Sequence, residues 1–475
     1  LYIDEEDAQD LVVEVERQLK KRQRGQAVRL EFEVGTSRFM RRFMTKEMNL
    51  EKEDMYQLDG PLDMTVFFGF CGIKGYNHLR YPEAHPHSPW SMLELKRTPE
   101  TNIFDMIREK DLLIHLPYES FDESVVNFLY SAANDKDVLA IKQTLYRVSS
   151  SSPVVQALEK AVQNGKQVTV LMEVKARFDE ANNILMARRL EKAGAHVIYG
   201  LVGLKTHSKC TLVIRREKDG IRRYVHVATG NYNASTAKLY TDLGILTCSD
   251  RFGIDASAFF NLLSGYSDPP IWDSFIVAPI NLRQRCIELI DREIHFAKNG
   301  EDAHMIAKMN SLLDKGIIEK LYEASQAGVK IELIVRGICV LIPGIPGASD
   351  NITVRSIVGR FLEHSRIFWF RNGGREELYI SSADWMPRNL NDRVELMVPI
   401  EDPEIKRRLK QMVDIELSDN QKAHIMQADG TWLKTISAEN QLCAQEYFQK
   451  IAEKRDAEDE MTLAQKLEPY TPVLG

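Results

Sequence analysis

Residues 157–170 read ALEKAVQNGKQVTV, and residues 318–333 read IEKLYEASQAGVKIEL. In both stretches a helical pattern of apolar residues ends at a glycine, Gly165 or Gly328, and a short run of strand-forming residues follows. A helix that stops at glycine and leads into a strand is one step of an alternating α/β chain. The two stretches therefore predict one structural unit that is used twice.

The residues around the first stretch continue the alternation. We expect strands at 138–146, 167–173, 197–199 and 209–214, with helices at 153–164 and 181–193. This succession predicts a parallel or mixed sheet that is covered by helices. The fold class is therefore α/β, with two tandem α/β domains at 95–272 and 273–475.

The ends of the chain have a different character. Residues 1–94 predict an α+β head domain, with a helix at 11–21 and strands at 27–34 and 64–71. The second α/β domain ends in a helical tail at 438–455, which we expect to pack on that domain. The chain begins with Leu1 rather than methionine, so we interpret it as a piece of a longer protein.

Composition limits the classes of function. The chain of 475 residues is 44% hydrophobic and 28% charged, as in ordinary globular proteins with several domains. Its net charge of -7 does not favour binding to nucleic acid, so a polyanion would need a local basic pocket. The six cysteines form no CxxC pair, which indicates reduced thiols in the cytoplasm, and no apolar run reaches the length of a membrane span.

Two histidine motifs follow the repeated unit. The first is His207-Ser208-Lys209, and the second is His364-Ser365-Arg366. In an extended backbone, residues two apart point to the same face, so each imidazole would lie beside a fixed positive charge. A phosphorus atom above that face would meet both groups. Two such motifs suggest a paired site for phosphate chemistry.

Each repeat also supplies an acid near its end. A histidine that accepts a phosphoryl group is best held through its other ring nitrogen by a carboxylate. We expect Asp242 to return to His207 and Glu395 to lie near His364. The alternative, that both acids are ordinary surface residues, is less consistent with their matched positions in the two repeats.

Phosphoryl transfer also requires positive charge around the phosphate oxygens. Arg147, Arg177 and Arg336 each follow a predicted strand, at the edge where ligands of open α/β sheets bind. Lys209 and Arg366 from the histidine motifs complete the set of cations. Each arginine taken alone is more simply explained as a solvated residue at a strand end. The chain has no GxxxxGK[ST] motif, so a nucleotide site would not be a P-loop.

Several longer motifs together resemble polyphosphate kinase of the first type, a bacterial family. These are TLYR (144–147), EVKARFDE (173–180), KTHSK (205–209), ATGNYN (228–233), YTDLG (240–244), IVRGIC (334–339) and FLEHSRIF (361–368). The resemblance covers nearly the whole chain. It implies two C-terminal domains of the phospholipase D fold, in which paired histidine motifs meet at one site.

The resemblance implies reversible transfer of the terminal phosphate of ATP to inorganic polyphosphate through a phosphohistidine. It assigns the nucleophile to His207, and to His364 a place near the nucleotide phosphates as proton donor or acceptor. Tyr240 and Arg336 would contact ATP, together with Lys209 and Arg366. The family associates Arg147 and Arg177 with Mg²⁺. Because arginine is a poor metal ligand, we interpret these two residues as binding phosphate oxygens that the metal also touches.

Members of the family also have an N-terminal helical domain and a complete head domain, and we expect this chain to hold neither the first nor all of the second. The resemblance implies a homo-oligomer for the full-length protein and a cytoplasmic location, with peripheral association with the inner membrane as an open alternative.

Two other functions remain open from the sequence. A phospholipase D-like phosphodiesterase would use the same histidine chemistry, although Arg366 stands where such enzymes usually have lysine. A non-enzymatic fragment that only binds polyphosphate is the third reading.

Overall fold

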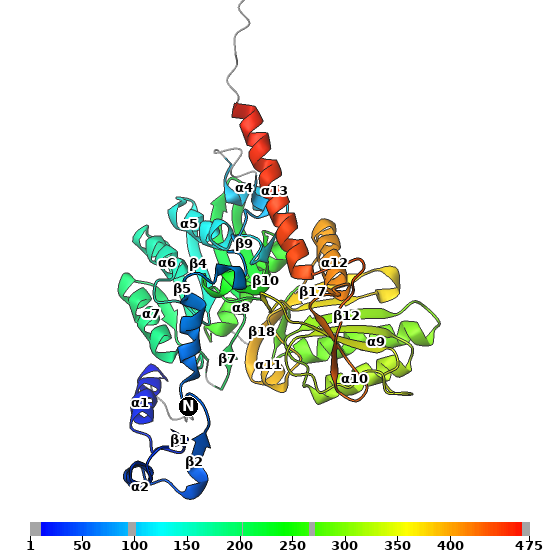
Figure 1. Cartoon of the computed structure of the whole chain (residues 1–475). Helices are drawn as coiled ribbons and strands as arrows, with labels where there is room; N and C mark the ends of the chain where they lie inside the picture. The colour runs from blue at the N-terminus through cyan, green and yellow to red at the C-terminus, as the bar shows by residue number, and fades with distance from the viewer. Residues whose placement is uncertain (1–10, 94–100, 202, 266–270, 468–475) are drawn as a thin grey trace, which may run out of the picture. The chain divides into compact units, whose positions relative to one another are not determined.

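The computed structural model describes residues 11–93, 101–201, 203–265 and 271–467, and the chain divides into two compact units (Figure 1). The first unit spans Leu1–Ala84, and the second spans His85–Gly475. Within the described residues, no helix combines the length and the apolar run needed to cross a membrane.

The first unit is an α+β structure. Its main elements are α1 (Leu11–Gln23), β1 (Leu30–Glu33), α2 (Arg38–Glu47), β2 (Met55–Leu58) and η2 (Met64–Gly72). Strands β1 and β2 pair in parallel. The prediction of a strand at 64–71 was wrong, because this run forms the 3₁₀ helix η2. The Asp63 side chain accepts hydrogen bonds from the backbone N–H and the hydroxyl of Thr65, which starts a turn instead of a strand.

The first sheet of the second unit is mixed. Its strand order is β15-β10-β9-β8-β4-β5-β6, and β3 also pairs with β10. The strands are β3 (Leu112–Leu116), β4 (Val138–Leu145), β5 (Gln167–Met172), β6 (His196–Ile198), β8 (Cys210–Glu217), β9 (Gly220–Ala228), β10 (Tyr240–Thr247) and β15 (Leu362–Glu363). The helices of this half are α4 (Ile103–Glu109), α5 (Asn127–Asn134), α6 (Pro153–Gln163), α7 (Glu180–Ala193) and α8 (Asp250–Leu263).

The second sheet has the order β11-β18-β17-β16-β12-β13-β14-β19-β20, and β7 also pairs with β18. The strands are β7 (Lys205–Thr206), β11 (Ile276–Ala278), β12 (His304–Met309), β13 (Lys330–Val335), β14 (Ile352–Ile357), β16 (Ile367–Phe370), β17 (Glu377–Ser381), β18 (Arg393–Pro399), β19 (Ala423–Met426) and β20 (Trp432–Lys434). The helices here are α9 (Leu282–Lys298), α10 (Lys315–Gln326), α11 (Pro387–Asn391), α12 (Pro403–Leu417) and α13 (Ala444–Leu467).

The two sheets confirm the predicted tandem α/β fold. In the first half, β4 pairs in parallel with β5 and antiparallel with β8; in the second, β12 pairs in parallel with β13 and antiparallel with β16. The crossover helices, α6 and α10, begin and end in the same way. Ser152 and Asp314 cap their first turns, and Gly165 and Gly328 follow their last turns with φ of +77° and +98°.

Two very short strands cross between the repeats. Strand β7, which precedes His207, pairs in parallel with β18 of the second repeat, in the register Thr206↔Val394. Strand β15, which precedes His364, pairs in parallel with β10 of the first repeat, in the register Glu363↔Thr241. Each histidine motif is therefore attached to the sheet of the opposite repeat.

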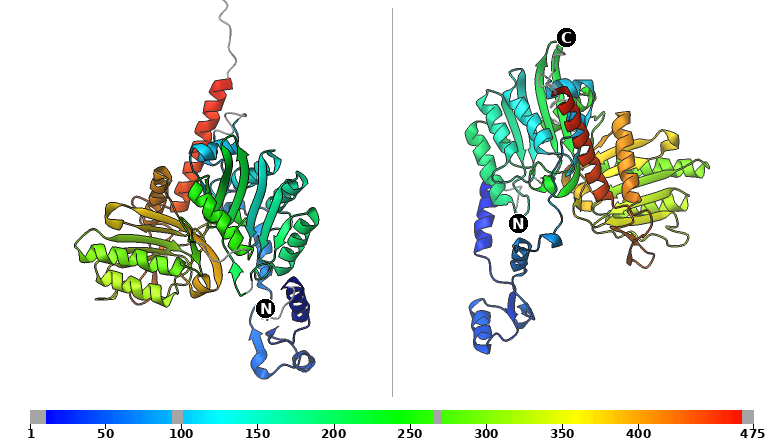
Figure 2. Two further views of the ribbon diagram at one scale, coloured as in Figure 1. Left: turned by 180° about the vertical axis from the view of Figure 1, so that it is seen from behind. Right: turned by 45° about the horizontal axis from the view of Figure 1, so that its top comes forward.

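The helical tail contacts both repeats. Helix α13 begins at Ala444, later than predicted, and lies beside α12 in the views of Figure 2. Its Phe448 ring packs edge-on against His115 of the first repeat, with ring centroids 5.1 Å apart. Its Gln445 side chain bonds to Phe361 in the second repeat. The expectation that the tail packs on the second repeat describes only one of these two contacts.

Candidate active site

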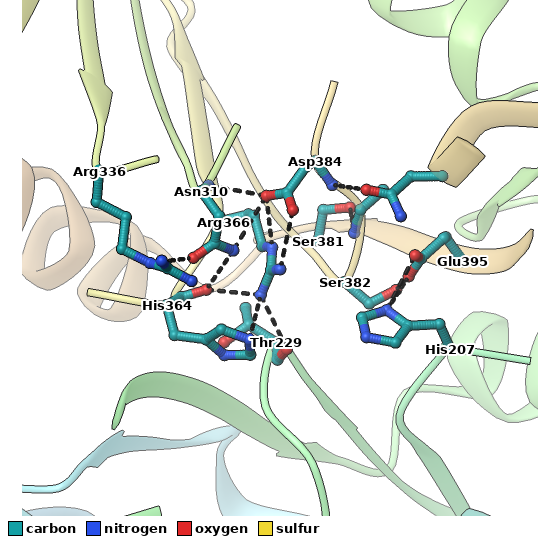
Figure 3. Close-up of polar contacts among 12 residues, drawn as sticks. His207, Thr229, Asn310, Arg336, His364, Arg366, Ser381, Ser382, Asp384 and Glu395 are labelled. Atoms are coloured by element: carbon teal, nitrogen blue, oxygen red, sulfur yellow. Dashed lines mark hydrogen bonds and ion pairs between the residues drawn. The ribbon is translucent and has the colours of Figure 1, made fainter. Parts of the chain in front are cut away.

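His207 is held by residues of the second repeat. It follows β7, and its backbone N–H donates to the carbonyl of Val394 at 2.9 Å. Its Nδ1 lies 2.9 Å from both carboxylate oxygens of Glu395, the residue after Val394 (Figure 3). Both side chains are buried. A hydrogen on Nδ1 can therefore be donated to Glu395, which leaves the lone pair on Nε2.

His364 repeats this arrangement with the repeats exchanged. Its backbone N–H donates to Thr241 Oγ1 at 3.2 Å, and its Nδ1 lies 2.8 and 2.9 Å from the two carboxylate oxygens of Asp242. Arg366 Nη1 lies 3.3 Å from His364 Nε2. Arginine only donates, so Nε2 accepts from it and the ring hydrogen lies on Nδ1, facing Asp242.

The predicted pairing of acids and histidines was wrong. Asp242 contacts His364 rather than His207, and Glu395 contacts His207 rather than His364. The reason is the strand exchange. Because β7 pairs with β18, the acid that reaches His207 must come from β18, and β15 brings His364 to β10 in the same way.

Each acid is also supported by a hydroxyl. Thr229 Oγ1 donates to Asp242 at 2.6 Å, and Ser382 Oγ donates to Glu395 at 2.5 Å. Gly230 adjoins the first of these contacts, where an added Cβ would come within 2.2 Å of Asp242 Oδ2. These neighbours fix the orientation of both carboxylates.

The two motif cations have different surroundings. Lys209 is buried, contacts the carbonyl oxygen of His207 and lies 5.6 Å from the centre of the Tyr146 ring. Arg366 is also buried, but its Nε and Nη2 donate to Asp384 at 3.1 and 3.3 Å. Its Nη1 donates to the carbonyl of His364 at 2.6 Å. Arg366 thus holds the second motif together, and Asp384 balances its charge.

The remaining predicted site residues form two groups, one beside His364 and one in the first repeat. The Tyr240 ring lies 5.2 Å from the His364 ring, and Arg336 Nε donates to the carbonyl of Glu363 at 2.5 Å. In the first repeat, Arg147 forms an ion pair with Asp179 at 2.9 Å and donates to the carbonyl of Arg177 at 3.1 Å. Arg336 and Tyr240 therefore adjoin His364, while Arg147 and Arg177 adjoin each other.

Burial sets the protonation states on the His207 side. It holds the pKa of His207 well below the usual range, and the charges of Lys209 and Arg393 act in the same direction. Burial raises the pKa of Glu395 to about 7 and lowers the pKa of Lys209 to about 7. His207 is therefore neutral near pH 7, as a nucleophilic imidazole must be.

On the His364 side the carboxylate is favoured. Burial acts to raise the pKa of Asp242, but the adjacent His364 and the hydrogen bond from Thr229 outweigh it, so that pKa is below its ordinary value. Burial also lowers the pKa of His364. A neutral imidazole facing an ionised carboxylate can accept a proton at Nε2, and it can release that proton again once it is protonated.

The two residues that the resemblance associates with Mg²⁺ are poor ligands for a metal. Among the residues that the structure describes, no three His, Cys, Asp or Glu side chains gather so as to hold a metal ion. Arg147 and Arg177 cannot coordinate a cation. The described side chains therefore fit phosphate oxygens better than Mg²⁺.

The sequence did not single out several residues of the site. Asn310 donates from Nδ2 to Asp384 at 3.0 Å and accepts from Arg336 Nε at 2.6 Å, so it links Arg336 to the acid that pairs with Arg366. Arg393 lies 3.9 Å from Glu395. Asn310 follows β12 as Tyr146 follows β4. An alignment of the two repeats was therefore the signal that could have pointed to Asn310.

Both histidine pairs belong to one site. Figure 3 shows the rings of His207 and His364 on the same side of the Arg366–Asp384 ion pair. The charges of Arg366 and His364 act on His207, and those of Arg366 and Asp242 act on Lys209. The two repeats thus bring their imidazoles and cations into one electrostatic environment.

The chain matches three domain families along its length. The polyphosphate kinase middle domain matches residues 1–70, C-terminal domain 1 matches residues 102–269, and C-terminal domain 2 matches residues 275–445. All three belong to polyphosphate kinase, which the sequence motifs had indicated.

Individual relatives agree. The chain is 54% identical over 426 residues to the polyphosphate kinase of Halalkalibacterium halodurans, covering 89% of this chain and 60% of the relative. It is 50% identical over 443 residues to that of Bacillus anthracis, covering 92% and 62%. The chain thus spans about three fifths of the length of these relatives.

A solved structure extends the comparison to the fold. The crystal structure of polyphosphate kinase from Porphyromonas gingivalis superposes with a TM-score of 0.81 at 34% identity, covering 90% of this chain and 65% of that one. Together with the three domain matches, this shows that the chain belongs to the polyphosphate kinase family of the first type.

Proposed function

We propose that the full-length protein catalyses reversible transfer of the terminal phosphate of ATP to inorganic polyphosphate. The observation that carries this proposal is the buried His207–Glu395 pair, which shares its site with the His364–Asp242 pair. Family membership supports the same substrates.

In the proposed first step, the Nε2 lone pair of His207 attacks the γ-phosphorus of ATP. A P–N bond forms, the bond from that phosphorus to the β–γ bridging oxygen breaks, and ADP leaves. The Nδ1 hydrogen stays with His207, and the Glu395 carboxylate stabilises the positive charge that develops on the ring.

In the second step, a terminal oxygen of polyphosphate attacks the phosphohistidine. A P–O bond forms and the P–N bond breaks, which restores neutral His207 and lengthens the polymer by one phosphate. His364 exchanges a proton with the phosphate oxygens through Nε2. Lys209, Arg336 and Arg366 would stabilise the oxygens electrostatically, and Tyr240 would contact the nucleotide.

Arg147 and Arg177 would bind outer phosphate oxygens. Mg²⁺, when bound with the nucleotide, would neutralise phosphate charge. Because the described residues offer no ligand set for it, we assign it to the phosphates and not to the protein.

Labelling of the full-length protein with γ-labelled ATP tests the proposal. Acid-labile, base-stable label should appear in the unaltered protein and be lost in His207→Ala. Label that persists in His207→Ala contradicts the assignment. Release of a phosphodiester product without ATP would favour the phospholipase D-like alternative, and polyphosphate binding without turnover would favour the binding fragment.

Assembly and location stay predictions. The homo-oligomer, the cytoplasmic location and peripheral membrane association rest on the resemblance to the family. Sedimentation of the full-length protein and fractionation of cells would test them.

A further inference from the structure

The residue before His364 is a buried acid that is contacted by three side-chain donors. The Glu363 carboxylate is contacted by Lys308 Nζ at 2.6 Å, Thr241 Oγ1 at 2.8 Å and Gln445 Nε2 at 2.6 Å. All three groups donate, so the carboxylate acts as their common acceptor. The donors come from β12, β10 and α13, which makes Glu363 a point where both repeats and the tail meet.

Two contacts lead from Glu363 to groups of the site. The Thr241 hydroxyl that donates to Glu363 also accepts the backbone N–H of His364 at 3.2 Å. Thr241 precedes Asp242 as Glu363 precedes His364, so this hydroxyl joins the backbones of the second histidine pair. The Glu363 carbonyl oxygen accepts from Arg336 Nε at 2.5 Å.

Helix α13 fixes the same segment from the other side. The Gln445 side chain donates to the carbonyl of Phe361 at 2.9 Å and accepts from its N–H at 3.0 Å. Gly359 leaves room for it, because a Cβ there would come within 2.4 Å of Gln445 Oε1. The backbone that carries Glu363 is therefore held at Phe361 as well as at Thr241.

The His207 side is built differently. The residues that correspond to Thr241 and Glu363 in the exchanged strands are Val394 and Thr206. The Thr206 hydroxyl has no hydrogen-bond partner within the described residues, and the Thr206 N–H donates to Glu173 at 2.7 Å. A side-chain hydrogen bond therefore joins the paired strands on the His364 side, and the described residues show no equivalent bond on the His207 side.

We propose that Glu363 is a positioning residue for phosphoryl transfer, acting through Thr241 on His364 and through its own carbonyl on Arg336. This inference rests on the proposed function. Glu363 itself touches no phosphate. It keeps the imidazole and the guanidinium at a fixed spacing, so that both meet the phosphates of one nucleotide in one orientation. Small errors in such spacing are costly to catalysis.

Four single variants and one double variant of the full-length protein test this inference. Glu363→Gln keeps the shape of the side chain and removes its charge. Thr241→Val removes only the linking hydroxyl, and Thr241→Ser restores it. Thr206→Val is the matched control, because it removes a hydroxyl that has no partner in the described residues.

We expect Glu363→Gln and Thr241→Val to lower kcat about tenfold, the effect of losing one hydrogen bond to a charged group, while KM for ATP changes less. Thr241→Ser should recover most of the loss, and Thr206→Val should keep kcat. The double variant Thr241→Val/Glu363→Gln should be no slower than Glu363→Gln. The reason is that Thr241 lies on the path by which Glu363 acts on His364, so the second change removes nothing further.

The inference is overturned if Thr241→Val retains full kcat, if it loses no more than Thr206→Val, or if the losses in the double variant multiply. Thermal melting shows whether Glu363→Gln folds. If it does not fold, the kcat values of Thr241→Val and Thr241→Ser decide whether the inference holds. A failure of the proposed function looks different, because the unaltered protein would then form no phosphohistidine.

Discussion

The Nδ1 atom of His207, in the first repeat, lies 2.9 Å from the carboxylate of Glu395, in the second. The reciprocal contact joins His364 of the second repeat to Asp242 of the first at 2.8 Å. Neither motif histidine therefore takes its acid from its own repeat. The pairing has a direct consequence for mutants of the acids.

Glu395→Gln should impair phosphorylation of His207 more than Asp242→Asn does. Replacing the carboxylate that holds a functional imidazole commonly costs about 10–100-fold. Rapid-quench measurement of label incorporation in a single turnover compares the two variants directly. A larger loss in Asp242→Asn would contradict the pairing described above.

The rate of phosphoryl transfer should have a maximum near neutral pH. Glu395 supports His207 only as a carboxylate, and its pKa is raised to about 7, so the rate falls as the pH drops through that value. Lys209 is cationic only below its pKa, which is lowered to about 7, so the rate also falls as the pH rises. The pH profile of kcat/KM checks both limbs. Lys209→Arg should remove the alkaline limb, and an unaltered profile in that variant would exclude Lys209 as its source.

Glu395→Gln should stabilise the fold at alkaline pH. The buried Glu395 carboxyl has a pKa of about 7 in the folded chain, against about 4.3 when unfolded, so the native state binds the proton more tightly. Its contribution to the free energy of unfolding therefore decreases as pH rises between those values. We expect a higher melting temperature than the unaltered protein at about pH 8 and a smaller difference at about pH 4.5. A constant difference at both pH values would contradict the linkage.

Gly230→Ala should damage the second histidine pair. Its new Cβ would lie 2.2 Å from Asp242 Oδ2, so the carboxylate must move away from His364. Overpacking of this kind costs about 1–3 kcal/mol of stability, and we expect a loss of activity of at least about tenfold. Gly72→Ala is the control, because nothing lies within 4 Å of its added Cβ. Steady-state rates and urea unfolding would compare the two variants. Equal rates and equal stabilities would contradict the prediction.

Lys308→Met should destabilise the second unit strongly. Lys308 is buried, 2.6 Å from Glu363 and in contact with Glu416, and its removal leaves both acids without their counter-charge. Breaking a buried pair in this way costs about 3–5 kcal/mol. The exposed pair of Lys315 and Glu319, 3.6 Å apart, provides the control: Lys315→Met should change stability by less than about 1 kcal/mol. Equal denaturant midpoints for Lys308→Met and Lys315→Met would contradict this prediction.

Local sequence patterns predicted much of this architecture. The periodicity and the glycines at 165 and 328 located α6, α10 and the strands after them to within a few residues. They also placed Arg366 beside the ring of His364. These features depend on residues that are neighbours along the chain.

The acid partners could not be predicted in the same way. Strands β7 and β15 have two residues each, too few for a periodic pattern, and their pairing depends on distant residues. Lys308 and Glu363 look like surface charges in the sequence, because only the folded chain shows that they neutralise each other. The run at 64–71 has the composition of a strand but no neighbouring strand to complete a sheet among the described residues.

The exchange of β7 and β15 makes the two halves functionally inseparable. Expressed as separate polypeptides, each would carry an orphan imidazole, and turnover would return only on reassociation. An ancestor with a single copy of the repeat would have needed a twin molecule, related by a two-fold axis, to assemble even one working centre. In this chain the two halves are not equivalent, because Glu363 anchors one side with a carboxylate and Thr206 stands at the matching position on the other.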